Sequence, residues 1–360
     1  TSHETATVAE PAPSEKHLAA RPALVRGSAP LMTRSVLVTG AAGFIASHVA
    51  DRLLSTGATV TGLDNFDPYY DPEQKRRNVV RASANSHYEL IEGDVRDRDL
   101  VERTFDRVRP DGVVHLAARA GVRASVDDPL SYVQVNEVGG LFVLEACRSR
   151  GGIPIVFAST SSVYGGDAVP PFREDDPATT PLSPYAASKR GAELMVYAYH
   201  HLHQLPVAVA RFFTVYGPRG RPDMAMSSFT RALLEGRELV LHGEETARDF
   251  TYVDDIVDGV LGALDWVTRT RGFDTFNLGR SEPVRVRRLI DLLSSELGVP
   301  ARVKLGELGA SEVAVTCADV SRAARTLGYA PKVSLEEGVR RWVDWTRSSD
   351  EAPVELRKPS

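Results

Sequence analysis

Tyr185 and Lys189 stand four residues apart in the stretch Tyr-Ala-Ala-Ser-Lys. Ser183 and Pro184, just before them, are typical of a helix start, as N-cap and first helical residue. The spacing then puts the phenol and the ammonium on one helix face. An ordinary phenol pKa is about 10, but a neighbouring positive charge favours the phenolate and predicts a lowered pKa. Such a pair could remove a proton from a substrate hydroxyl. The alternative is an exposed helix face where the two residues meet by chance.

Lysine is rare in this chain, since it accounts for only six of the 43 basic residues. Arg190 follows Lys189 directly, so arginine supplies the surface charge even at the neighbouring position. The choice of lysine at 189 therefore indicates a need for a compact ammonium group.

Four hydroxyl groups, Ser159 to Ser162, follow the predicted strand 153–158. Ligands bind at the carboxyl edge of parallel sheets, so a hydroxyl there can bond the reacting oxygen and relay its proton. We expect one of the four to be catalytic. Each can also be read as a turn hydroxyl that bonds only its own backbone.

A glycine-containing turn, Gly40-Ala-Ala-Gly43, connects the predicted strand 35–39 to a predicted helix over 44–54. Glycines allow a tight turn and close approach to a pyrophosphate, and the helix N-terminus offers free N–H groups. Asp64 ends the next strand, 21 residues past Gly43. A carboxylate at this position accepts hydrogen bonds from ribose hydroxyls and disfavours a 2′-phosphate. The pattern predicts a dinucleotide site for NAD, although such a turn can also merely end a strand.

Short apolar runs alternate with amphipathic stretches from Ser35 onward, which predicts an α/β fold with a doubly wound parallel sheet of the Rossmann type. After about residue 211 the alternation weakens. The predicted organisation is a disordered tail over 1–32, an NAD-binding domain over 33–210, a mainly substrate-binding domain over 211–347 with segments returning to the first, and a tail over 348–360.

The composition narrows the class of protein. A net charge of −5 argues against a nucleic-acid partner, and two cysteines exclude a disulfide scaffold or a cysteine-rich metal site. We predict no metal. No uninterrupted apolar stretch is long enough for a membrane span, and residues 1–32 lack the apolar core of a secretory signal. The sequence therefore predicts a cytoplasmic protein.

The motifs together resemble the extended short-chain dehydrogenase/reductases that act on nucleotide sugars. The resemblance spans roughly residues 33–347 and rests on the glycine turn, Asp64, His115–Ala118, Ser159–Gly165, Tyr185–Lys189 and Arg211–Pro218. It implies a Rossmann domain, a smaller C-terminal substrate domain, bound NAD and a homodimer. By resemblance, Tyr185 is the base, Lys189 its partner, Thr160 the third catalytic residue, and Asn136 a support for the active-site helices.

The same resemblance assigns the residues around the cofactor. Asp94 would reach the adenine amino group, although it can equally be a helix cap. The expected NAD-binding residues are Gly40, Ala42, Gly43, Phe44, Ile45, Asp64, Asn65, Asp94, Val95, Leu116, Ala117, Ala118, Tyr185 and Lys189.

The choice of reaction depends on the positions after Thr160. The 4,6-dehydratases and decarboxylases of this family carry carboxylates there, whereas this chain has Ser161 and Ser162. That favours a 4-epimerase. The run from Thr214 to Ala225 and the stretch ending at Arg123 resemble UDP-glucuronate 4-epimerases, which implies a UDP-sugar substrate.

Hydroxyl groups and a guanidinium can bind a substrate carboxylate by donating hydrogen bonds to it. We expect Ser161, Ser162, Thr214 and Arg221 to form its pocket, with Arg123 nearby. Arg248 matches a diphosphate-contacting arginine, or is a surface ion-pair partner of Asp249. A UDP-glucose 4-epimerase, a 4,6-dehydratase and a non-catalytic dinucleotide sensor remain alternatives.

Overall fold

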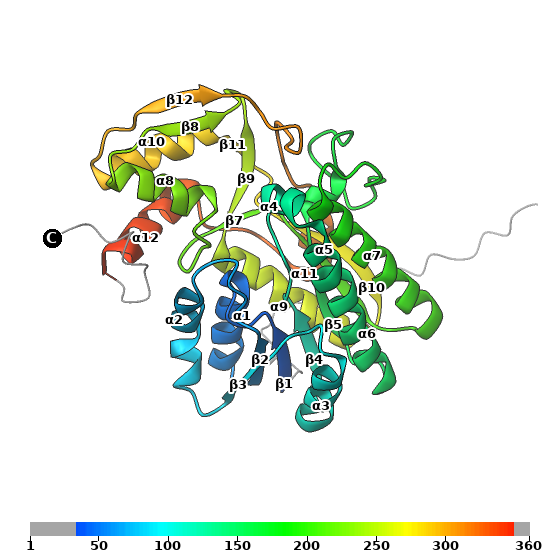
Figure 1. The fold of residues 1–360 in the computed structure, drawn as a ribbon. Helices are drawn as coiled ribbons and strands as arrows, with labels where there is room; N and C mark the ends of the chain where they lie inside the picture. Colours follow the sequence, from blue (N-terminus) through cyan, green and yellow to red (C-terminus); the bar gives the residue numbers. More distant parts are fainter. Residues whose placement is uncertain (1–33, 349–360) are drawn as a thin grey trace, which may run out of the picture. The chain divides into compact units, whose positions relative to one another are not determined.

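A seven-stranded parallel sheet forms the centre of the computed structural model, which describes residues 34–348 (Figure 1). Its order is β10-β6-β5-β4-β1-β2-β3, so the chain reverses direction across the sheet between β1 and β4. The strands are β1 (Ser35–Thr39), β2 (Thr59–Asp64), β3 (Tyr88–Glu92), β4 (Gly112–His115), β5 (Ile155–Thr160), β6 (Val207–Phe212) and β10 (Phe273–Leu278). Strands β4, β5 and β6 are buried along their whole length, which explains their continuous apolar runs. The predicted Rossmann-type fold is confirmed.

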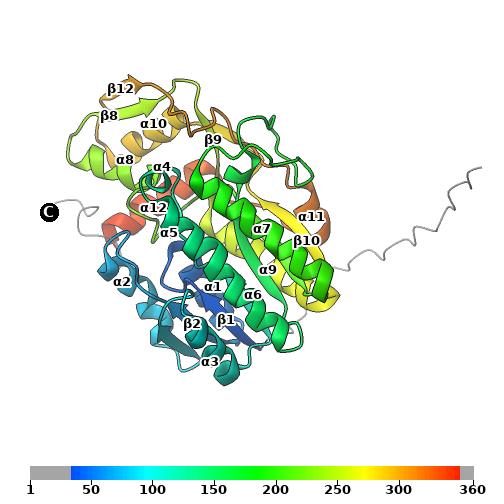
Figure 2. The same cartoon turned by 45° about the vertical axis from the view of Figure 1, so that its right-hand side comes forward.

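Helices cover both faces of this sheet (Figure 2). Helices α1 and α9 pack against each other on one face, with α2 beside α1, and α3, α6 and α7 pack on the other. Their bounds are α1 (Phe44–Ser55), α2 (Pro72–Ser83), α3 (Arg98–Val108), α6 (Gly140–Ser149), α7 (Pro184–His203) and α9 (Val253–Thr270). Ser183 caps α7 by accepting the Ala186 N–H at 3.1 Å, and Pro184 is its first residue, as predicted.

A continuous helical stretch precedes β5. It runs through α5 (Pro129–Val133), a π-helical segment (Gln134–Gly139) and α6, after the short α4 (Val122–Asp127). Asp128 caps it by accepting the Ser131 N–H. This stretch lies beside α7 in both views.

A second group of elements, here called the C-terminal lobe, stands beyond the carboxyl ends of the sheet strands (Figure 1). It contains a three-stranded sheet of order β11-β9-β7, the parallel pair β8 and β12, and three helices. The bounds are β7 (Thr214–Tyr216), α8 (Ala225–Leu234), β8 (Leu239–His242), β9 (Ala247–Tyr252), β11 (Pro283–Arg285), α10 (Val286–Leu297), β12 (Val303–Gly306) and α12 (Leu335–Ser348), while α11 (Ser321–Leu327) packs on α9 and β10.

The chain does not divide between the two parts at one residue. The predicted boundary after residue 210 falls inside β6, whose pairing with β5 continues to Phe212. Helix α9 and strand β10 then return to the main sheet before the C-terminal lobe is completed.

Within residues 34–348 no helix is both long and apolar enough to cross a membrane. The cytoplasmic location stays a prediction of the sequence. The predicted tails, 1–32 and 348–360, lie outside the described residues except for Ser348, which ends α12.

Candidate active site

A cavity of about 370 Å³ opens at the carboxyl ends of the sheet strands. Residues that follow both β1 and β4 line it, so it lies where the chain reverses direction across the sheet, the usual ligand position in such folds. Every residue predicted to bind the cofactor lines this cavity except Ala42. In residues 34–348 no three His, Cys, Asp or Glu side chains gather as metal ligands would.

The turn before α1 packs so closely against the protein backbone that only glycine fits at two of its positions. Gly40 has a φ of +70°, and a Cβ on it would meet the Ala117 backbone nitrogen at 2.7 Å. A Cβ on Gly43 would meet the Gly40 carbonyl oxygen at 2.9 Å. No side chain caps α1, so the first N–H groups of this helix are available to an anion. These features fit the pyrophosphate of a dinucleotide.

Asp64, at the end of β2, is almost fully buried at the rim of the cavity. Its carboxylate accepts the Ala42 N–H at 3.0 Å and the Phe66 N–H at 2.8 Å, while burial raises its pKa. The two bonds fix the carboxylate in place and leave further lone pairs for ligand hydroxyls.

Asp94 also lines the cavity and accepts hydrogen bonds from Asn65 and Arg96. Helix α3 is capped by Asp97 instead, which accepts the Leu100 N–H at 3.0 Å. The reading of Asp94 as the helix cap is therefore wrong.

Tyr185 and Lys189 both face the cavity from the first turns of α7. Burial lowers the pKa of Lys189 to about 8, opposed by the charge of Glu193. The pKa of Tyr185 is raised because burial disfavours the phenolate, while its hydrogen bond with Thr160 and the charge of Arg221 lower it. The prediction that the Tyr185 pKa is lowered is wrong for the protein without ligands, because desolvation outweighs the hydrogen bond and the charge that favour the phenolate.

Thr160 ends β5, is almost buried and lines the cavity. Its Oγ1 accepts the Ser162 N–H at 3.2 Å in addition to bonding Tyr185. Ser161 and Ser162 begin the short helical turn Ser161–Tyr164 and do not line the cavity. Of the four hydroxyl residues, Thr160 and Ser159 line it.

A buried ion pair connects α7, the helix that carries Tyr185 and Lys189, to β6. Glu193, one turn after Lys189, accepts two hydrogen bonds from the Arg211 guanidinium, both at 2.8 Å. Asn136 donates to the Ser188 hydroxyl at 2.9 Å and bonds the Arg119 backbone in both directions. These contacts fix α7 against β6 and the π-helical segment.

Arg221 is the one predicted substrate-binding residue that lines the cavity. Its guanidinium bonds both carboxylate oxygens of Asp223, at 3.0 and 2.7 Å, and lies over the Tyr69 ring. Thr214 lines a small neighbouring cavity with Phe44 instead.

Arg123 and Arg248 lie outside the lining of the main cavity. Arg123 pairs with Glu312 of the C-terminal lobe at 2.7 Å. Arg248 donates to the carbonyl oxygens of Ala247 and Ala314. Asp249 is buried and accepts backbone N–H groups such as that of Ala318, so the surface pair of Arg248 with Asp249 is wrong.

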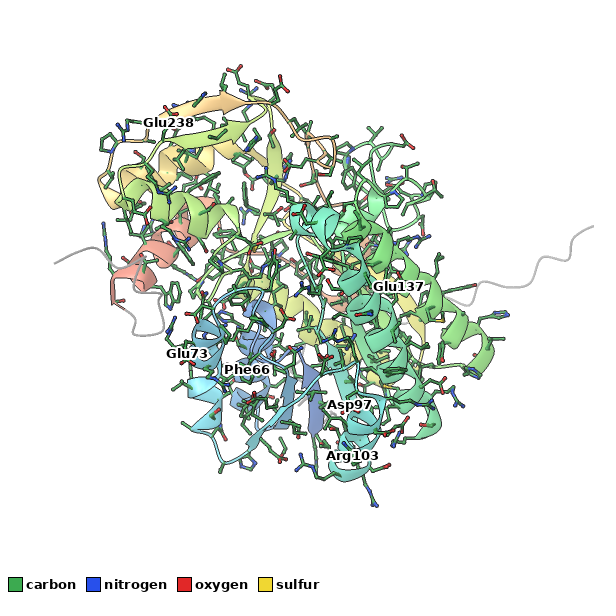
Figure 3. All side chains as sticks on the ribbon, in the orientation of Figure 1. Phe66, Glu73, Asp97, Arg103, Glu137 and Glu238 are labelled. Atoms are coloured by element: carbon green, nitrogen blue, oxygen red, sulfur yellow. The ribbon has the colours of Figure 1, made fainter. Side chains whose placement is uncertain are left out.

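Among the residues of the cavity wall that the sequence reasoning missed, five have polar side chains: Asp67, Tyr69, Tyr70, Lys75 and Arg119. The first four belong to the segment between β2 and the first turns of α2, and Figure 3 labels Phe66 and Glu73 in this segment. Two adjacent tyrosines and a lysine soon after Asp64 were the available signal.

Four features together define a dinucleotide-dependent enzyme of the Rossmann class: the sheet order, the glycine turn, the acid at the end of β2 and the helix that carries Tyr185 and Lys189. The sequence model of the NAD dependent epimerase/dehydratase family matches residues 36–279. The chain belongs to this family.

Named relatives are similar over most of the chain. UDP-glucuronate 4-epimerase 1 of Arabidopsis thaliana is 43% identical, over 86% of this chain and 76% of the relative. UDP-glucuronate 4-epimerase of Thermodesulfobacterium geofontis is 40% identical, over 88% of this chain and 97% of the relative. The crystal structure of UDP-glucuronic acid 4-epimerase from Bacillus cereus with UDP-glucuronic acid and NAD has a TM-score of 0.80 at 35% identity, and the match covers 86% of this chain and 98% of that one.

Proposed function

We propose that the protein is an NAD-dependent UDP-glucuronate 4-epimerase, which interconverts UDP-glucuronate and UDP-galacturonate. The observation that carries the proposal is that Tyr185, Thr160 and Arg221 line one cavity. A proton acceptor and a carboxylate-binding guanidinium are thereby brought to the same ligand. The names of the similar proteins support the same activity.

The cofactor would be held by residues already placed around the cavity. The first N–H groups of α1 would donate hydrogen bonds to its phosphates, and Asp64 would accept hydrogen bonds from ribose hydroxyls. Lys189 lines the same cavity as Tyr185, at the end where the sugar reacts. When bound, NAD would accept a hydride from C4 of the sugar, and its reduced form would return the hydride to the ketone.

The protein residues handle the proton and the orientation of the sugar. Tyr185 takes the proton of the C4 hydroxyl as that carbon is oxidised and returns it when the ketone is reduced. Thr160, hydrogen-bonded to Tyr185, holds the same oxygen. The positive charge of Arg221 and the hydrogen bond from Thr160 stabilise the phenolate during the transfer.

Arg221 also has a protective task in this mechanism. The 4-keto form of glucuronate is a β-keto acid, which loses CO2 readily. A guanidinium that binds the carboxylate, with serines rather than acids at 161 and 162, keeps the carboxylate on the sugar until C4 is reduced. Ser161, Ser162 and Thr214 would complete this pocket after a local rearrangement, since they do not line the cavity now.

The test is to incubate the enzyme with UDP-glucuronate, UDP-glucose and dTDP-glucose in parallel and to identify products by NMR. We expect UDP-galacturonate from the first substrate, and a loss of about 10²- to 10⁴-fold in kcat for Tyr185→Phe. UDP-xylose or a UDP-4-keto-pentose as the main product would refute the assignment. Preferred turnover of UDP-glucose would instead identify a UDP-glucose 4-epimerase.

We further propose a homodimer formed by α7 and the helical stretch from α5 to α6. Large apolar side chains are exposed on these helices, among them Leu130 at 64%, Leu194 at 57% and Leu202 at 70%. An exposed apolar surface over two adjacent long helices is typical of a subunit interface. A second copy of the chain would bury it.

A further inference from the structure

Lys75 is a buried lysine that the proposed mechanism does not use. It lies on α2 with 8% of its surface exposed and lines the cavity. Of the four lysines in the described residues, Lys75 and Lys189 are buried in this cavity, whereas Lys304 and Lys332 are exposed. Each buried lysine is followed by an arginine, in a chain that otherwise prefers arginine. The sequence argument made for Lys189 therefore applies to Lys75 as well.

The ammonium group of Lys75 is only partly satisfied by the protein. Its Nζ donates to the Asp67 carbonyl oxygen at 2.7 Å and lies 4.7 Å from the centre of the Tyr70 ring. In residues 34–348 that is its one hydrogen bond, although an ammonium has three donors. The Tyr70 hydroxyl beside it is buried and also lacks a partner within these residues. Buried donors without partners are costly unless a ligand meets them.

The nearby carboxylates do not form a close ion pair with Lys75. The Asp67 side chain is engaged by Arg119, with an N–O distance of 2.9 Å. Asp64 accepts backbone N–H groups and acts on Lys75 only through longer-range attraction. Burial lowers the pKa of Lys75, while the charges of Asp64 and Asp67 oppose this shift. Within residues 34–348 Lys75 is thus a buried cation of the cavity wall without a close carboxylate partner, so an anionic ligand oxygen suits it.

We propose that Lys75 binds the diphosphate of the dinucleotide, together with the backbone N–H groups at the start of α1. This inference rests on the proposed function only in assuming that a dinucleotide occupies the cavity. A compact ammonium suits a phosphate oxygen as a point charge, which explains lysine rather than arginine at this position. The anion replaces the missing partners and offsets the cost of burying the charge.

The direct test measures binding of ADP-ribose by calorimetry to the full-length protein and to Lys75→Met. ADP-ribose carries the diphosphate but no nicotinamide, so its binding does not depend on catalysis. We expect the dissociation constant to rise about 10- to 100-fold, as for the loss of one charge-assisted hydrogen bond. Lys304→Met, at an exposed lysine on β12, is the matched control and should bind as the unaltered protein does. A change below twofold in Lys75→Met would overturn the proposal.

A purely structural role makes a different prediction. If Lys75 only tethers the segment around Asp67, then Lys75→Met weakens the binding of adenosine and of ADP-ribose by the same factor. In that case the proposal fails. If Lys75 binds the diphosphate, adenosine competes for the site equally well in both proteins. Lys75→Gln, which keeps a donor for the Asp67 carbonyl without the charge, should show the same loss and serves if the methionine variant does not fold. Inactivity on UDP-glucuronate combined with Lys75-dependent binding of ADP-ribose would refute the proposed function alone.

Discussion

The Tyr69 hydroxyl donates a hydrogen bond to the Asp223 carboxylate at 3.3 Å, and this contact joins the segment after β2 to the segment before α8. Asp223 simultaneously holds the Arg221 guanidinium, whose centre lies 5.7 Å from the Tyr69 ring. The arginine assigned to the substrate carboxylate is therefore oriented by residues from both sides of the cavity.

This arrangement predicts a positioning role for Asp223. Asp223→Asn removes the charge that orients Arg221, so we expect kcat/KM for UDP-glucuronate to fall about tenfold, mainly through a higher KM, as for one weakened charge-assisted contact. Steady-state assays test this. Asp291→Asn, at an exposed aspartate paired with Arg287, should leave both constants unchanged. A fall in kcat at constant KM would contradict the positioning role.

The Glu193–Arg211 pair should contribute strongly to folding stability. Both side chains are about 4% exposed, so Glu193→Gln leaves a buried guanidinium without its counter-charge. We expect the free energy of unfolding to fall by about 3–5 kcal/mol, measured by urea denaturation. Asp265→Asn breaks a half-exposed pair with Arg269 and should cost less than about 1 kcal/mol. Equal effects in the two variants would show that burial of the pair is unimportant.

His115 predicts a specific acid sensitivity. It is buried, its Nδ1 lies 2.7 Å from the Thr39 hydroxyl, and burial lowers its pKa to about 3. The unfolded chain takes up this proton near pH 6.5, whereas the folded protein does not until about pH 3. Stability is therefore lost as pH falls through this window, by up to about 1.4 kcal/mol per pH unit. Urea denaturation at several pH values should show a shallower dependence for His115→Asn. An unchanged slope would contradict the assignment.

The proposed dimer can be tested on α7. Leu194→Glu places a charge in the exposed apolar surface, so we expect a monomer by analytical ultracentrifugation where the unaltered protein is a dimer. Val240→Glu, at a 43% exposed position on β8, is the control and should not change the assembly. If Leu194→Glu remains a dimer, the interface is formed by another surface and the proposed one is wrong.

Local spacing was sufficient to predict the fold class and several of the residues that line the cavity. The turn at Gly40 and Gly43 and the helix that carries Tyr185 and Lys189 depend on residues close together in sequence. The contact of Arg221 with Tyr69 joins segments far apart in the chain, and that of Glu193 with Arg211 joins a helix to the next strand. No local pattern specifies either contact.

The direction of the Tyr185 pKa shift was also beyond a sequence argument. The charge that lowers the Tyr185 pKa is that of Arg221, which is distant in sequence, and the burial that outweighs it exists only after the whole cavity has formed. Asp94 shows the same limit, because two aspartates three residues apart both suit a helix start and only the folded backbone selects Asp97.

The late return of β10 to the main sheet has a consequence for biosynthesis. Residues 273–278 pair with β6, which leaves the ribosome some 60 residues earlier. At typical synthesis rates the outer edge of β6 stays unpaired for several seconds, and such an edge can pair with other nascent chains. Helix α9, made just before β10, packs on β5 and β6 and covers one face only at the end of that interval. A chain truncated at residue 211 would keep the glycine turn and the catalytic helix but never close this edge, so we expect it to aggregate rather than bind nucleotide.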